Sequence, residues 1–119
     1  GNSAPYLQYT VARTNSVLAK AQTVNSKQLT VNNLNDEEKK ILRSFSRFSE
    51  IIATAAKSYS PNLLANYLFD LAQKYNNFYN QHRIIGGENE AFKLRLTSAI
   101  GQVLKNGLTL LGIETPERM

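Results

Sequence analysis

The chain has 119 residues, 42% of them hydrophobic, and it has no cysteine, which excludes disulfides, thiolate catalysis and cysteine-ligated metals. This length and composition favour one globular domain with its own core. Lysine and arginine number 14 against nine acidic residues, and the net charge of +5 raises the expectation of a phosphate-bearing partner.

The first predicted helix covers residues 5–22. Ser3 can cap it, and Pro5 suits its first turn because the missing N–H would be unpaired there in any case. One arc of about 80° on this helix is expected to face the core, and it holds Leu7, Val11, Thr14, Leu18 and Ala21. Residues 23–34 are rich in Asn and β-branched residues and are predicted to form a loop.

The second predicted helix begins after Asn35 and ends near Tyr59. Asn35 can cap it, and Glu38, three residues later, can complete a capping box. The acidic residues 36–38 place negative charge in the first turn, where the helix dipole favours it. Its core face is predicted to hold Ile41, Phe45, Phe48, Ile52 and Ala56.

The third predicted helix begins at Ser60 and Pro61, a cap followed by a first-turn proline. It is expected to stop before the glycine pair at 86–87, because consecutive glycines break helices. One face carries Leu64, Leu68, Leu71, Ala72, Tyr75 and Tyr79.

The fourth predicted helix runs from Glu88 to Leu111, with Gly112 placed just beyond its C-terminus. Gly107 lies inside it, where glycine costs about 1 kcal/mol against alanine, so we expect a close helix approach there. Its apolar face holds Phe92, Leu96, Ala99, Ile100, Val103, Leu104 and Leu111. Four amphipathic helices predict an all-α fold, an antiparallel bundle of four main helices in a single domain, 1–119.

Catalytic and metal-binding patterns are missing. His82, near the end of the third predicted helix, is the single histidine and cannot make a standard zinc or di-iron site, so we interpret it as a helix-end residue. Asp70 stands alone off the apolar arc and is expected at the surface. No glycine-rich nucleotide loop or nucleophile elbow occurs. No catalytic or metal-ligating residue is therefore predicted.

No apolar run approaches the roughly 20 residues that a membrane span requires. The N-terminal residues lack the basic-then-apolar layout of a secretory signal. We therefore expect a soluble, cytoplasmic protein without a membrane partner.

An aromatic and basic stripe lies beside the apolar arc of the first predicted helix. Helical spacing puts Tyr6, Tyr9, Arg13 and Lys20 on neighbouring positions. Tyrosines at such a boundary often pack their rings and leave the hydroxyl in water. Rings beside cationic groups are also how proteins hold unpaired bases and phosphates of RNA. Both interpretations remain open at this point.

A second aromatic cluster lies in YNNFYNQHR, residues 75–83. Tyr75 and Phe78 are expected to be core aromatics near a helix end. Asn76 offers both donors and acceptors, which base edges require. The periodicity gives Asn76 no clear structural role, so it joins Tyr79 among the candidate RNA contacts.

Three segments, GNSAPYLQYTVAR, LANYLFDLAQKYNNFYN and VLKNGLTLLGIETPERM, together resemble the C-terminal anticodon-binding domain of arginyl-tRNA synthetase, the domain named after an Asp-Ala-Leu-Arg signature. The resemblance covers essentially the whole chain. Two departures occur: LNDEEKK lacks the prolines that the family often carries, and LRLTSAIGQVL keeps the signature spacing loosely. Neither departure touches the proposed RNA face.

The resemblance implies a C-terminal fragment of a class I synthetase that joins arginine to its tRNA with ATP and Mg²⁺, both used by a separate catalytic domain of the same chain. It implies that the first helix and the C-terminal end lie near the anticodon loop of tRNA-Arg, and that the helix carrying Asn76 forms a second contact region. The residues expected to bind tRNA are Tyr6, Gln8, Tyr9, Arg13, Lys20, Asn76, Tyr79 and Met119.

The main alternative is a helical protein–protein interaction module that uses the same tyrosines against a partner. The two classes differ in salt dependence, because RNA binding falls steeply with salt and apolar docking does not. A catalytic bundle is disfavoured by the missing acid–base and ligand sets. Within the family, a cysteinyl-type domain is the alternative, and the PERM ending favours arginine.

Overall fold

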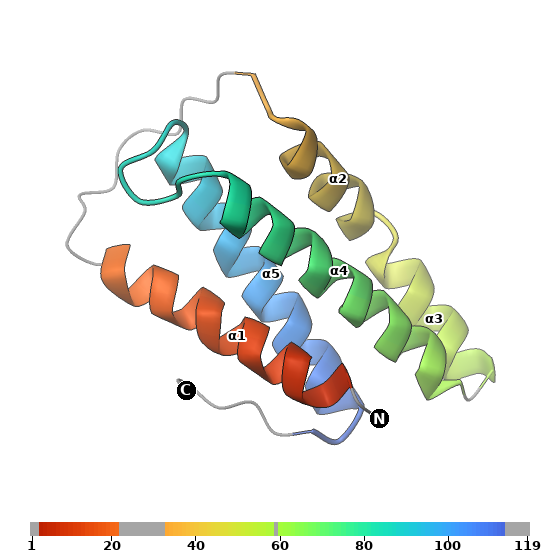
Figure 1. The fold of residues 1–119 in the computed structure, drawn as a ribbon. Helices are drawn as coiled ribbons and strands as arrows, with labels where there is room; N and C mark the ends of the chain where they lie inside the picture. Colours follow the sequence, from red (N-terminus) through yellow and green to blue (C-terminus); the bar gives the residue numbers. More distant parts are fainter. Residues whose placement is uncertain (1–2, 22–32, 59, 114–119) are drawn as a thin grey trace.

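A computed structural model describes residues 3–21, 33–58 and 60–113 of the chain. Within these ranges the backbone forms five helices and no strand (Figure 1). They are α1 (Ser3–Lys20), α2 (Asp36–Phe45), α3 (Phe48–Ser58), α4 (Pro61–Gln81) and α5 (Glu90–Leu110). The all-α prediction is confirmed.

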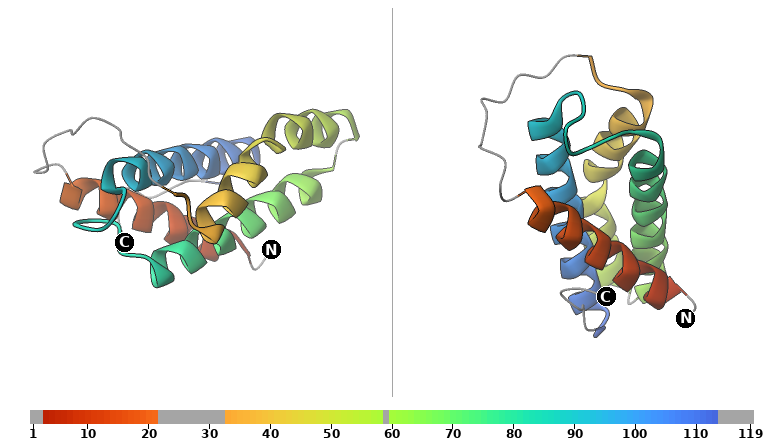
Figure 2. Two further views of the ribbon diagram at one scale, coloured as in Figure 1. Left: turned by 90° about the horizontal axis from the view of Figure 1, so that it is seen from above. Right: turned by 60° about the vertical axis from the view of Figure 1, so that its left-hand side comes forward.

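The helices succeed one another in alternating directions. In Figure 1, α1 and α4 run toward one end of the bundle, whereas α5 runs back, as do α2 and α3 taken together. Helix α1 packs on both α4 and α5, and α2 and α3 pack mainly on α4 (Figure 2). The predicted bundle of four main helices is present, with α2 and α3 in the place of the second.

The second predicted helix is interrupted at Ser46 and Arg47. The Arg47 N–H donates to the Ser44 carbonyl at 3.1 Å, a tight turn, and the helix resumes with an Ile51 N–H bond to the Arg47 carbonyl. The buried Tyr67 hydroxyl of α4 also donates to the Ser44 carbonyl, at 2.9 Å. A backbone carbonyl at the break of the helix therefore accepts a hydrogen bond from a side chain of another helix.

The predicted start of α2 is confirmed as a capping box. The Glu38 N–H donates to Asn35 Oδ1 at 2.8 Å, and the Asn35 N–H donates to Glu38 Oε1 at 2.9 Å. Glu38 is fully buried, and its Oε2 lies 3.6 Å from Nζ of Lys93 on α5. Lys93 Nζ also donates to the Glu88 carbonyl. This buried ion pair ties the start of α2 to the start of α5.

Other helix ends differ from the predictions by a few residues. Helix α1 already includes Ser3, so this residue opens the helix instead of preceding it as a cap. Ser60 is the N-cap of α4 but makes no side-chain capping bond. Helix α4 ends at Gln81, well before the glycine pair, because His82 is already extended at φ −131°.

The end of α5 is a Schellman motif, as the position of Gly112 predicts. Gly112 has φ +77°, its N–H donates to the Thr109 carbonyl, and the Ile113 N–H donates to the Leu108 carbonyl at 2.8 Å. Only glycine adopts this backbone without strain, so the helix ends where the sequence indicates.

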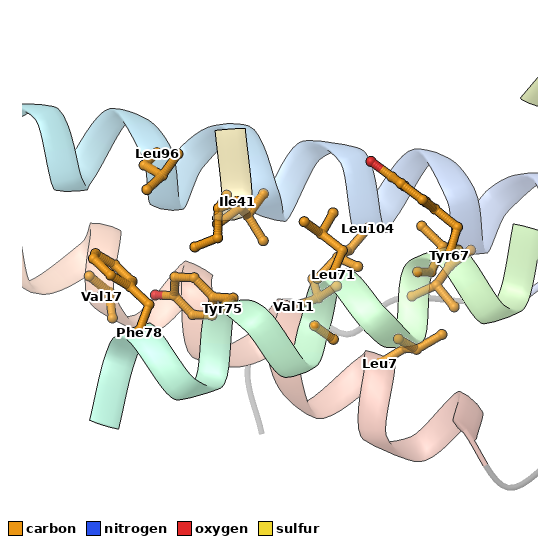
Figure 3. Packing of buried hydrophobic residues seen from close by; sticks show 14 of the residues in the cluster. Leu7, Val11, Val17, Ile41, Tyr67, Leu71, Tyr75, Phe78, Leu96 and Leu104 are labelled. Carbon is orange, nitrogen blue, oxygen red and sulfur yellow. The ribbon is translucent and has the colours of Figure 1, made fainter. Parts of the chain in front are cut away.

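The core lies between α1, α4 and α5 and is closed on one side by Ile41 of α2 (Figure 3). Tyr75 and Phe78 are fully buried in it, which confirms them as core aromatics. Burial raises the pKa of Tyr75 to about 12, against the opposing effect of its hydroxyl contact with Thr97. The Tyr75 hydroxyl therefore stays neutral at physiological pH.

Residues predicted to face the core are buried near the middle of each helix face, but some at the ends of a face are not. Leu7, Val11 and Thr14 of α1 are buried, but the arc ends on Val17, whereas Leu18 and Ala21 are only half-buried. Two alanines expected on core faces, Ala56 and Ala99, are exposed. Asp70 is half-exposed and pairs with Lys74 one turn later, as expected of a surface residue.

Gly107 marks a close approach between α5 and α4, as expected. A Cβ added there would lie 2.4 Å from Cδ1 of Leu68, which is fully buried. Gly101 makes a similar approach to α1, where an added Cβ would lie 2.6 Å from Thr14 Oγ1. The two glycines let α5 sit directly against both neighbouring helices.

Replacing Gly107 by alanine is expected to lower the free energy of unfolding by up to about 2 kcal/mol. Overpacking a core costs roughly 1–3 kcal/mol, and the helix propensity of alanine returns about 1 kcal/mol. Urea denaturation measures the change. The exposed Ser98→Ala on the same helix is the control and should stay within about 0.5 kcal/mol of the original chain. A Gly107→Ala chain about 1 kcal/mol more stable than the original would contradict the close approach, because alanine would then have added helix propensity without overpacking.

Candidate nucleic-acid interface

The guanidinium of Arg13 lies where α1 faces α4. Its Nη1 donates to Asn76 Oδ1 at 2.7 Å, and its Nη2 donates to the Tyr9 hydroxyl at 2.7 Å. Its Cζ lies 4.9 Å from the centroid of the Tyr9 ring and 4.2 Å from that of Tyr79. Two cation–π contacts and two hydrogen bonds therefore fix the orientation of one cation. We call Tyr9, Arg13 and Tyr79 the aromatic–arginine cluster.

Asn76 supports the cluster from behind. It is only 8% exposed, and its Nδ2 donates to the Tyr6 hydroxyl at 2.9 Å and to Thr10 Oγ1 at 3.0 Å. Its Oδ1 accepts from Arg13, as described above. The Tyr6 ring in turn packs on Phe69, with ring centroids 5.1 Å apart. One buried amide thus links α1 to α4 and orients the arginine.

The outward side of the cluster is exposed. Tyr9 is 45% exposed and Tyr79 is 37% exposed, although both are large aromatic residues. Beside them a hollow of about 210 Å³ opens on the surface. It is lined by Tyr9, Ala12, Arg13, Ser16, Val17, Lys20 and Tyr79. The hollow therefore combines flat rings with two cations.

A second hollow of about 290 Å³ adjoins the first. Its lining repeats Val17, Lys20 and Tyr79 and adds the segment that follows α4. The added residues are His82, Arg83, Ile84 and Ile85. In the part of the chain that the structure describes, Lys20 has no ion-pair partner. Its charge is therefore available to a ligand of either hollow.

His82 is the C-cap residue of α4, so its interpretation as a helix-end residue is confirmed. Its Nε2 lies 2.7 Å from Oε1 of Glu37 on α2, and its ring packs near Phe78. The hydrogen bond and charge of His82 lower the pKa of Glu37. His82 thus fastens α2 to the end of α4.

The described ranges hold no cluster of three His, Asp or Glu side chains that could bind a metal ion. Across the same ranges, no helix has the length and apolar character needed to cross a membrane.

The sequence model of one family, the DALR anticodon binding domain, matches residues 7–119. The chain belongs to this family. The resemblance of the three sequence segments is therefore confirmed over nearly the whole length of this DALR domain.

Curated relatives of the DALR domain carry the name arginine–tRNA ligase. The protein from Flavobacterium psychrophilum is 38% identical, and the one from Parabacteroides distasonis is 40% identical. Each alignment covers 100% of this chain and 20% or 21% of the relative. The chain therefore spans about a fifth of the length of these relatives.

Two solved structures of similar proteins have a similar fold. Arginyl-tRNA synthetase from Thermus thermophilus has a TM-score of 0.88 and 31% identity, over 100% of this chain and 21% of that one. A putative arginyl-tRNA synthetase from Campylobacter jejuni has a TM-score of 0.85 and 27% identity, over 99% of this chain and 27% of that one. The helical arrangement of the DALR domain is shared with both.

Most of the predicted site residues of the DALR domain come together in the structure. Those brought together at the junction of α1 and α4 are Tyr6, Tyr9, Arg13, Lys20, Asn76 and Tyr79. Gln8 is half-buried on α1 and lines neither hollow. Met119 lies outside the described residues, as does most of the predicted loop at 23–34.

The second hollow includes three residues that were not predicted as site residues from the sequence: Arg83, Ile84 and Ile85. The signal was Arg83 itself, a cation at the end of the aromatic segment 75–83. The two isoleucines carried no such signal, because an aliphatic pair before glycines resembles the end of a core helix.

Proposed function

We propose that the chain is one domain of an arginine–tRNA ligase and that it binds the anticodon loop of tRNA-Arg in the cytoplasm. The observation that carries this proposal is the orientation of Arg13 between two exposed tyrosine rings, beside Lys20. Family membership and the names of the relatives agree with it.

The exposed rings of Tyr9 and Tyr79 would stack unpaired bases of the loop. Such stacking contributes about 1–3 kcal/mol per base and tolerates any base, because every base has a flat face. The Arg13 guanidinium is planar as well, and it retains N–H donors for phosphate or base oxygens after its two internal hydrogen bonds. The cluster therefore offers stacking and directed hydrogen bonding at one place.

Asn76 would act by positioning Arg13 and not by touching RNA, since it is buried and its amide bonds three partners. A cation that is already oriented loses less side-chain entropy on binding. Tyr6 would act in the same way through its hydroxyl.

Lys20, at the end of α1, would neutralise a backbone phosphate. Each phosphate neutralised on a single strand steepens the salt dependence, with a slope of about −0.7 in log affinity against log salt. Gln8 and Met119 stay predicted contacts of the loop.

Arginylation itself would take place in a catalytic domain of the same chain, with ATP and Mg²⁺. Among the described residues, no three His, Asp or Glu side chains gather into a metal site, and we assign Mg²⁺ to that catalytic domain. The contribution of this domain would be to hold the anticodon so that the distant acceptor end reaches the catalytic domain.

A protein contact is supported on a different face. An apolar hollow of about 340 Å³ is lined by residues of α3, the start of α4 and the end of α5. Figure 1 shows these segments together at one end of the bundle. Leu110 at the edge of this hollow is 61% exposed. We propose that the catalytic domain packs on this end, which leaves the aromatic–arginine cluster to RNA.

The test is a titration of a labelled arginine anticodon stem-loop with the 119-residue chain at two salt concentrations. A hairpin with an unrelated anticodon is the control. Binding that favours the arginine loop and weakens with salt would support the proposal. Equal binding of both hairpins, or none, would contradict it and favour the interaction module.

Replacing Tyr9 by alanine is expected to weaken stem-loop binding by roughly 5- to 100-fold, the loss of one stacking ring. The fold should survive because the ring is half-exposed. Fluorescence anisotropy measures the affinity, and circular dichroism checks the helices. Tyr9→Phe is the matched control, since it keeps the ring and removes only the hydroxyl. A folded Tyr9→Ala chain that binds like the original would contradict the stacking role.

A further inference from the structure

The two hollows beside Tyr79 share a wall. Val17, Lys20 and Tyr79 line both of them. The Arg13 guanidinium lies 4.2 Å from the centroid of the Tyr79 ring, and Arg13 lines the first hollow but not the second. The Tyr79 side chain also lines the second hollow, so a ligand there would contact Tyr79 without displacing Arg13.

The second hollow differs from the first in its chemistry. Its added lining contains two aliphatic residues, Ile84 and Ile85, beside His82 and Arg83. Two polar atoms of its lining are already engaged within the protein: Arg83 Nε donates to the Ile85 carbonyl at 2.9 Å, and His82 Nε2 bonds Glu37. This hollow can therefore accept a flat apolar face more readily than it can read a polar edge.

The turn after α4 gives the second hollow its shape. Gly86 has φ +76°, and a Cβ added there would lie 3.3 Å from Arg83 Nη2. The Arg83 side chain thus folds back over its own turn and fixes the carbonyl of Ile85. The aliphatic wall is held in place before any ligand arrives.

We propose that the second hollow binds one further nucleobase, that of the nucleotide adjacent to the one in the first hollow. Tyr79 separates the two bases, and Lys20, which borders both hollows, holds the phosphate that joins them. The second base is bound by its face, between Tyr79 and the isoleucines, and its identity is read weakly. This inference rests on the proposed binding of an RNA loop.

The test combines variants of the chain with stem-loops that carry a single abasic nucleotide at each loop position in turn. Ile85→Ala is expected to weaken binding of the intact loop about fivefold or more. The affinity of the Ile85→Ala chain should then fall no further when the base is removed from one particular nucleotide, the one that occupies the second hollow. Tyr9→Ala should show the same insensitivity at the neighbouring nucleotide. Two variants insensitive at the same nucleotide, or at nucleotides that are not neighbours, would overturn the proposal.

The joining phosphate is tested separately. A methylphosphonate linkage between the two identified nucleotides removes its charge, and Lys20→Gln removes the cation. The original chain should bind the modified RNA more weakly than the unmodified RNA. The Lys20→Gln chain should bind both RNAs with equal affinity. Additive losses would overturn the assignment of Lys20 to this phosphate.

Base identity provides the last check. Exchanging the base at the second position should change affinity less than exchanging the base at the first. Strong discrimination at the second position would overturn binding by the face alone.

Two controls distinguish a loss of binding from a loss of stability, and a failure of this inference from a failure of the proposed function. Ile85 is half-buried, so thermal unfolding of Ile85→Ala is measured, and the milder Ile85→Val should show a smaller loss in the same direction. If the original chain binds no stem-loop, the proposed function fails together with this inference. If it binds with salt dependence and neither Ile85 variant differs from it, only this inference fails.

Discussion

Replacing Arg13 by methionine is expected to weaken anticodon stem-loop binding by roughly 10- to 100-fold, or about 1.4–2.8 kcal/mol. The change removes a cation that two rings and two hydrogen bonds orient toward the hollow. Because a phosphate contact would be lost with it, the salt dependence should also become shallower. Titrations at several salt concentrations measure both quantities.

Arg47→Met is the matched control for Arg13→Met, because it makes the same change in net charge. Arg47 is exposed in the turn between α2 and α3, which lie on the far side of α4 from α1 (Figure 1). This variant should lose less than threefold in affinity, an effect of overall charge only. Equal losses for both variants would show that the bundle attracts RNA by net charge and not through the cluster.

Replacing Lys93 by methionine is expected to lower the free energy of unfolding by about 3–5 kcal/mol, since it leaves a buried carboxylate without its cation. The side chains of Lys93 and Glu38 are 5% and 1% exposed. Within the described residues, Glu38 Oε2 accepts no hydrogen bond that could replace the lysine. Urea denaturation followed by circular dichroism measures the loss.

Two further variants separate the ion pair from general effects of the substitution. Lys105→Met on the same helix is the control, because Lys105 has no ion-pair partner among the described residues and should change stability by less than about 1 kcal/mol. The double variant Glu38→Gln with Lys93→Met removes both charges and keeps the capping geometry. It should recover most of the lost stability. A double variant as unstable as Lys93→Met alone would contradict a charge-based explanation.

Local interactions explain which parts of the fold could be predicted from the sequence. The capping box of Asn35 and Glu38 and the glycine end at Gly112 involve residues at most five apart, so their spacing was sufficient. The break at Ser46 could not be predicted, because it is marked by neither glycine nor proline. The Ser44 carbonyl at this break accepts a hydrogen bond from the Tyr67 hydroxyl, 23 residues away on another helix.

In the candidate site as well, features that depend on local spacing could be predicted, and features that depend on how the helices pack could not. The stripe of Tyr9 and Arg13 follows from helical spacing alone. That Tyr79 completes the cluster, and that Asn76 is buried behind it, depends on how α4 docks against α1. A polar residue in an aromatic segment looked like an RNA contact, whereas its hydrogen-bond partners are 63 to 70 residues away in the sequence.

The hydrogen bonds of Asn76 make the docking of α1 and the assembly of the cluster one event. Helix α1 supplies Tyr9 and Arg13, α4 supplies Tyr79, and the amide joins the two helices. A ligand that binds only the assembled cluster stabilises that state by mass action. RNA would therefore slow the local opening of α1, and the protection of its backbone amides from hydrogen exchange would report occupancy of a surface that those amides never touch.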